Sequence, residues 1–140
     1  MSLVRPHLFA VMCLALTPGV ASSNVAEIPR LDGEIKVDGV LSGGEWHDAL
    51  RLELNIETDP AENEPAPVRT TVFLIEDGES LYIAFAADDP NPDLIRAYLR
   101  DRDSAWSDDH VGIILDTYND ERRAFEFYAN PLGVQMDKTR

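Results

Sequence analysis

Acidic residues gather around a tryptophan between residues 101 and 116. The group consists of Asp101, Asp103, Trp106, Asp108, Asp109 and Asp116. Carboxylates are the hard oxygen ligands that Ca²⁺ prefers. An exposed indole ring can stack on the apolar face of a sugar while nearby carboxylates bind its hydroxyl groups. This segment is therefore the candidate functional site of the chain.

The carbohydrate hypothesis centres on Trp106, which lies in a charged loop where packing partners are scarce. Tyr98, Arg100 and Asp103 in the same segment complete the candidate carbohydrate-binding set. The alternative is structural, because a loop often folds one tryptophan back as an anchor.

The metal hypothesis rests on Asp108, Asp109 and Asp116. The acidic segment is not an EF-hand loop. Asp101-Arg102-Asp103, which could begin such a loop, is followed neither by the required glycine nor by the terminal bidentate glutamate. The alternative is that these acids are solvated loop charges paired with neighbouring arginines.

Catalytic chemistry has less support than binding. A glycosidase needs two carboxylates at a set separation, and no acid in the sequence is marked as buried and perturbed. His47 and His110 have neither a nucleophile motif beside them nor the paired spacing of a metal site. The sequence therefore does not predict an enzyme made of this domain alone.

Short β-forming runs separated by turn residues organise the chain after residue 31. The expected strands are a brief run at 34–37, a half-buried one at 52–56, a hairpin of 68–75 and 81–87, an apolar strand at 110–116 buried on both faces, an alternating strand at 125–129, and a last strand from 134. A proline-rich stretch at 59–67 should be an exposed loop. Such close strand spacing predicts an all-β antiparallel sandwich.

One or two short helical turns are expected beside the strands. Ser42 and Glu45 have the spacing of a capping box, which would start one turn and direct Trp46 and Ala49 inward. Trp46 should plug the core, because a large ring beside apolar neighbours is usually buried. A second short helix is expected at 93–99.

The first residues are typical of an export signal. A basic start, an apolar stretch at 8–16 and small residues at 19–21 predict a signal peptide over residues 1–21 and cleavage near Ala21 or Ser22. Cys13, the one cysteine, lies inside it, so the mature chain would have no thiol. We therefore expect an exported protein that is periplasmic, outer-membrane-associated or secreted.

The charge of the chain restricts its partners. Twelve basic residues against twenty-six acidic ones give a net charge of −14. A surface with this charge repels phosphate backbones and anionic lipids, so we expect no binding to nucleic acid.

Two separated segments resemble one known family. Residues 31–33 and 37–49, which include Val37-Asp38-Gly39-Val40-Leu41 and Glu45-Trp46, look like the opening of the carbohydrate-binding module family 9-like domain. Residues 107–116, with Asn119-Asp120 and Asn130-Pro131-Leu132-Gly133, are similar to that domain at the front of large exported bacterial proteins. The resemblance runs from about residue 32 to 137 and implies a β-sandwich.

The resemblance also implies a function. It suggests a non-catalytic module that binds a polysaccharide or oligosaccharide, with structural Ca²⁺ as in some family members. Related sandwiches hold haem through Met and Lys, which keeps Met136 and Lys138 open as a further alternative. The expected organisation is a lead-in at 22–31 and a domain at 32–140 that is truncated at its C-terminus, with a β-rich region downstream.

Two alternatives to free-standing carbohydrate binding remain. In the first, the domain has no sugar affinity and is an interaction or accessory domain of an outer-membrane-associated β-rich protein. In the second, it is an auxiliary domain of a glycoside hydrolase. The number of exposed aromatic side chains on one face distinguishes a sugar platform from an interaction domain.

Overall fold

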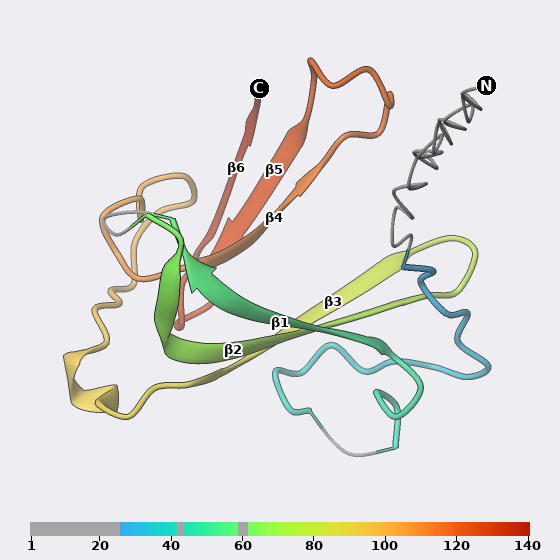
Figure 1. The fold of residues 1–140 in the computed structure, drawn as a ribbon, viewed down its shortest axis with the longest axis horizontal. Coiled ribbons are helices and arrows are strands. Elements are labelled where there is room, and N and C mark those ends of the chain that lie inside the picture. Colours follow the sequence, from blue (N-terminus) through green and yellow to red (C-terminus); the bar gives the residue numbers. More distant parts are fainter. Residues whose placement is uncertain (1–25, 42–43, 59–61) are drawn as a thin grey trace, which may run out of the picture.

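The computed structural model describes residues 26–41, 44–58 and 62–140. Its elements, in chain order, are β1 (Leu50–Glu57), β2 (Glu64–Glu76), β3 (Leu81–Asp88), the 3₁₀ helix η1 (Pro92–Leu94), β4 (Val111–Leu115), β5 (Phe125–Ala129) and β6 (Gln135–Thr139). The strands form two antiparallel sheets: sheet A has the order β1-β2-β3 and sheet B the order β4-β5-β6 (Figure 1). The prediction of an all-β, antiparallel architecture is confirmed for these residues.

Sheet A lies between two other parts of the molecule (Figure 1). Residues 26–41 and 44–49 run along one of its faces, and sheet B lies on the opposite side. The face of sheet A toward sheet B carries alternate apolar side chains from all three strands, among them Leu52, Val72 and Phe85, which lie in one cross-strand row. This arrangement of two sheets is sandwich-like.

Trp46 plugs the core on the other face of sheet A, as the sequence predicts. Its side chain is 7% exposed and clusters with Ile35, Ala49 and Ile75. The ring of Phe73 meets it edge-on, with 6.4 Å between ring centroids. Hydrophobic burial of this tryptophan thus fastens the segment 26–49 onto sheet A.

The helical turns differ from the prediction. Ser42, one end of the expected capping box, lies outside the described residues, and residues 44–48 form a turn rather than a helix. At 93–99 only η1 is helical, since Pro92 opens it and Ile95 returns to an extended backbone with ψ 121°. The expected extended run at 34–37 is not a strand.

No helix in the described part of the chain is long and apolar enough to cross a membrane.

The expected loop at 59–67 is partly strand, because β2 begins at Glu64. Pro65 pairs with Ile56 after a register shift in β1. β3 pairs with β2 only as far as Arg69, so residues 64–68 have no ladder partner in β3, and of these residues Glu64 and Pro65 alone pair with β1. A strand with one free side tolerates proline, since the missing N–H would not be bonded there.

Burial of the strands is lower than the sequence predicts. Leu52, Leu54 and Ile56 on β1 are 42%, 48% and 56% exposed, and Ile114 on β4 is 52% exposed. Ile114 lies in a cross-strand row with Glu126 and Lys138, so its face of sheet B carries charge rather than a second apolar layer. The expectation that β4 is buried on both faces is therefore wrong.

Candidate functional site

Asp108 is the most deeply buried acid of the predicted site. Its side chain has no exposed surface. One oxygen, Oδ2, accepts hydrogen bonds from the Tyr98 amide at 2.9 Å and from the Asn130 side-chain amide at 3.0 Å. The other, Oδ1, lies 3.5 Å from Nε of Arg100 and has no hydrogen-bond partner among the described residues. Asp108 thus ties the segment at 98–100 to the turn that begins at Asn130.

Asn130 uses both ends of its side chain. Its Oδ1 accepts from the amides of Leu132 and Val134 at 3.0 and 2.9 Å, which shapes the turn between β5 and β6. Its Nδ2 donates to Asp108 and to the Tyr98 carbonyl, each at 3.0 Å. With 4% exposure, Asn130 is a buried polar group whose hydrogen-bonding capacity is satisfied.

The surroundings of Asp108 keep it ionised. Burial is the largest single influence and raises the pKa, but the hydrogen bonds from Tyr98 and Asn130 and the charges of Arg100 and Arg96 together outweigh it. The pKa of Asp108 therefore lies below its ordinary value. A buried carboxylate held in this way is usually part of a polar network that fixes the local structure.

The low pKa of Asp108 predicts a loss of stability in acid. The unfolded chain binds the proton at about pH 4, whereas the folded chain binds it only at lower pH, so the stabilisation is present above about pH 4 and is lost as the pH falls further. Urea unfolding midpoints between pH 6 and pH 2 should decline for the native chain. Asp108→Asn should be less stable at pH 6 and show a shallower decline. Equal declines in both proteins would contradict a role for Asp108.

Trp106 lies on the outer face of sheet B and is 41% exposed. Its indole N–H donates to the Asp103 carbonyl at 2.9 Å. The ring packs edge-to-face on Tyr128, with 5.5 Å between centroids, and Lys138 Nζ lies 5.4 Å from its centre. Asp103 in turn accepts from the Asp137 amide at 2.8 Å, which fixes the loop to β6. Trp106 is therefore both anchored and partly open to solvent.

Tyr98 and Arg100 form the second half of the predicted carbohydrate-binding set. The Arg100 guanidinium lies 5.2 Å from the centre of the Tyr98 ring, and this tyrosine is 55% exposed. Both backbone polar groups of Tyr98 are held by Asp108 and Asn130. The structure thus arranges the predicted set as two pairs, Trp106 with Asp103 and Tyr98 with Arg100.

The three predicted metal ligands bind different backbone groups. Asp109 accepts from the Arg96 amide at 2.8 Å. Asp116 accepts from the amides of Tyr118 and Glu121, at 3.0 and 2.8 Å, and the hydrogen bond from Glu121 contributes most to the lowering of its pKa. No group of three His, Cys, Asp or Glu side chains that could hold a metal occurs within residues 26–41, 44–58 and 62–140. Calcium binding stays a prediction.

The sequence did not predict Glu126, a buried acid near Trp106 with two partly exposed basic partners. Glu126 is 1% exposed, accepts from the Tyr128 hydroxyl at 2.5 Å, and lies 3.3 Å from Lys138 Nζ and 3.4 Å from Arg140 Nε. The hydrogen bond from Tyr128 is the main reason that the pKa of Glu126 is lowered. The sequence signal was weak: an acid between two aromatic residues of an alternating strand. Met136, the other residue of the haem alternative, is buried in the same region.

Comparisons of this chain with models of protein families, with curated proteins and with solved structures give no match.

Proposed function

We propose that this chain is an exported, non-catalytic carbohydrate-binding domain that acts through Trp106. The observation that supports it most directly is the state of this side chain: the ring is held from two sides by Asp103 and Tyr128, yet 41% of it is exposed. A preorganised ring loses little conformational entropy when a sugar stacks on it. Export rests on the sequence of residues 1–21, and a mature protein that retains Met1 would contradict it.

Polar groups beside the ring are of the kind that bind sugar hydroxyls. The ammonium of Lys138 lies over the ring of Trp106, and Asp103 and Arg102 in the same loop are about half exposed. Tyr98 offers a second exposed aromatic side chain in the same loop region. These groups suit a neutral or mildly acidic oligosaccharide better than a flat crystalline surface, since few rings are exposed together.

Trp106→Ala should strongly weaken carbohydrate binding. Affinity electrophoresis of the whole chain against a panel of soluble polysaccharides would identify a ligand, and titration calorimetry would then measure its Kd. We expect Trp106→Ala to weaken binding at least ten-fold. Tyr118→Ala is the matched control, because Tyr118 is 53% exposed and lies in the β4–β5 loop under Arg123. Equal affinity of both variants and the native chain would contradict the proposal.

Structural calcium is part of the same proposal. If Asp108, Asp109 and Asp116 contribute to a cation site, millimolar Ca²⁺ should raise the melting temperature through mass action on the folded state. Asp109→Asn should remove that gain and leave the melting temperature in chelator nearly unchanged. Differential scanning calorimetry with Ca²⁺ and with chelator tests this. Identical melting temperatures would contradict the cation site and leave these carboxylates with the contacts within the chain described above.

A second candidate function is that of an interaction domain without sugar affinity. One observation favours it: three successive inward-facing residues of β1, Leu52, Leu54 and Ile56, are between 42% and 56% exposed. Single exposed apolar residues are common, but a row of them on one strand is typical of a surface that contacts other protein. A chain that binds no polysaccharide in the panel would favour this second candidate.

A further inference from the structure

β3 is an edge strand of sheet A whose outer side has no strand partner among the described residues. The backbone bonds at its start show which way its polar groups point. The Glu76 amide donates to the Pro29 carbonyl at 3.1 Å, and the Glu76 carbonyl accepts from the Leu31 amide at 2.7 Å. Glu76 therefore directs both groups away from its cross-strand partner, Leu81.

The same alternation continues along the strand. In an antiparallel ladder, bonded and non-bonded residue pairs follow each other in turn. Since the Glu76–Leu81 pair is non-bonded, the backbone N–H and C=O groups of Leu81, Ile83, Phe85 and Ala87 point to the free side of β3. This edge therefore offers four residues whose backbone groups can pair with another strand.

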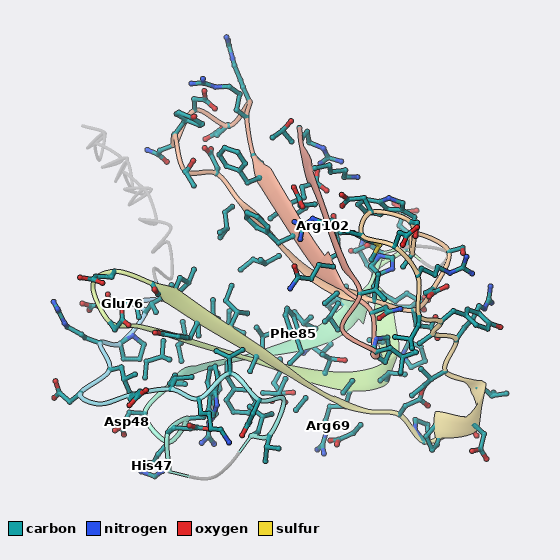
Figure 2. The ribbon with its side chains drawn as sticks, turned by 180° about the vertical axis from the view of Figure 1, so that it is seen from behind. His47, Asp48, Arg69, Glu76, Phe85 and Arg102 are labelled. Atoms are coloured by element: carbon teal, nitrogen blue, oxygen red, sulfur yellow. The ribbon has the colours of Figure 1, made fainter. Side chains whose placement is uncertain are left out.

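Two apolar hollows flank this edge, one on each face of sheet A. The first has a volume of about 520 Å³ and lies between β3 and the segment 36–41, with Trp46 in its wall. The second, about 380 Å³, lies between β3 and sheet B and is lined by Val111, Ile113 and Phe127. Ile83 and Phe85 line both hollows. Figure 2 shows Phe85 between sheet A and the side of the molecule that carries Arg102.

The hollows match the side-chain period of a β-strand. Successive side chains of a strand point to opposite faces of its sheet. A strand bonded to the free edge of β3 would therefore place one set of side chains in the hollow beside Trp46 and the other set in the hollow beside Phe127. Backbone pairing would give affinity and the two hollows would select the side chains.

The residue types of β3 do not prevent another strand from pairing with this edge. Residues 81–87 include no charged residue and no proline, although natural edge strands usually carry one or the other. The opposite edge of sheet A differs, since β1 carries Arg51, Glu53 and Glu57. Acidic residues bound the uncharged part of β3 at both ends, with Asp77 and Glu79 before it and Asp88 and Asp89 after it. Arg69 pairs with Asp88 and Arg30 contacts the turn at Asp77, so each end keeps an excess of one negative charge.

We propose that the free edge of β3 binds an extended segment of another polypeptide, with an uncharged apolar centre of about five residues and basic residues at its ends. Its centre would pair with Leu81, Ile83, Phe85 and Ala87 and fill the two hollows. Its basic ends would meet the acidic residues that bound β3. This inference is distinct from carbohydrate binding through Trp106, because the peptide would pair with the backbone of β3. Tyr128, which packs against Trp106, and Arg102 from the same loop also line the second hollow.

Charge argues for a different chain as the occupant rather than a second copy. Two antiparallel β3 strands would bring the acidic end of each, at 88–89, toward the acidic turn of the other, at 77–79. Like charges facing each other across strands are destabilising. The net charge of −14 adds a general repulsion between copies.

The probe for this site is a synthetic peptide with a Val-Ile-Val-Leu-Val centre and two lysines at each end. Titration calorimetry with the whole chain should detect binding. The control peptide has the same sequence with N-methyl groups on alternate central amides, which removes the backbone donors and keeps every side chain. We expect the control to bind at least ten-fold more weakly. Equal binding of the two peptides would overturn the proposal.

Hydrogen exchange locates the bound peptide. The amides of Ile83 and Phe85 should become protected when the peptide is added, while the exchange of the β1 amides should not change. Phe85→Lys, which puts a charge between the hollows, should abolish binding, whereas Leu54→Lys on β1 should not. Protection confined to β1 would overturn the site. Analytical ultracentrifugation tests whether a second copy of this chain occupies the edge. A dimer that dissociates when the peptide is added would overturn the proposal of a different polypeptide and identify a second copy as the occupant.

Discussion

Replacing Trp46 with alanine should lower the free energy of unfolding by about 3–5 kcal/mol, as large-to-small changes at buried aromatic residues do. The ring is 7% exposed and contacts the core cluster of Ile35, Ala49 and Ile75. Its removal would leave a cavity and release the segment 26–49 from sheet A. This is a large share of the stability of a small domain, for which about 5–15 kcal/mol is typical.

Urea denaturation followed by circular dichroism measures this change. Trp106→Ala is the matched control, because it removes the same side chain from a position that is 41% exposed. Its loss of stability should be clearly smaller, since less apolar surface returns to water. A change below about 1 kcal/mol for Trp46→Ala would show that the segment 26–49 does not depend on this contact.

Gly112→Ala should lower the free energy of unfolding by about 1–3 kcal/mol, the usual effect of overpacking. A Cβ at this position would lie 2.8 Å from the Phe127 carbonyl oxygen and still closer to the Tyr128 ring. Backbone at this distance cannot move aside without disturbing the β4–β5 pairing. The Tyr128 ring would shift as well, although its hydroxyl is bonded to Glu126 and the ring packs against Trp106.

Gly44→Ala is the control for this change, because a Cβ there meets no atom within 4 Å. It should leave stability nearly unchanged. Near-ultraviolet circular dichroism should report the altered setting of Tyr128 and Trp106 in Gly112→Ala alone. If Gly112→Ala is as stable as the native chain with an unaltered aromatic spectrum, the packing of Tyr128 over Gly112 is not required for this side of sheet B.

Sequence by itself determines the elements of this fold that depend on local chemistry. The alternating residues of β1 and β5 and the β-forming runs of the β2–β3 hairpin predict strands because each pattern acts within a few neighbouring residues. Asp77 accepts from the Glu79 and Ser80 amides, and Gly78 has φ 92°, so the hairpin turn is encoded in consecutive residues. The burial of Trp46 was equally predictable, since a large ring among apolar neighbours is rarely left in water.

Tertiary structure alone decided how the parts of the site meet. Asp108 and Asn130 are 22 positions apart, and their contact depends on the β4–β5 and β5–β6 registers rather than on either motif. The same registers place Lys138 opposite Glu126, so this buried acid has a basic partner across the strands. Exposure of Leu52 and Ile114 also depends on what covers each sheet, and no residue pattern within a strand encodes that. A strand pattern fixes which side chains share a face, but only packing between sheets fixes what that face touches.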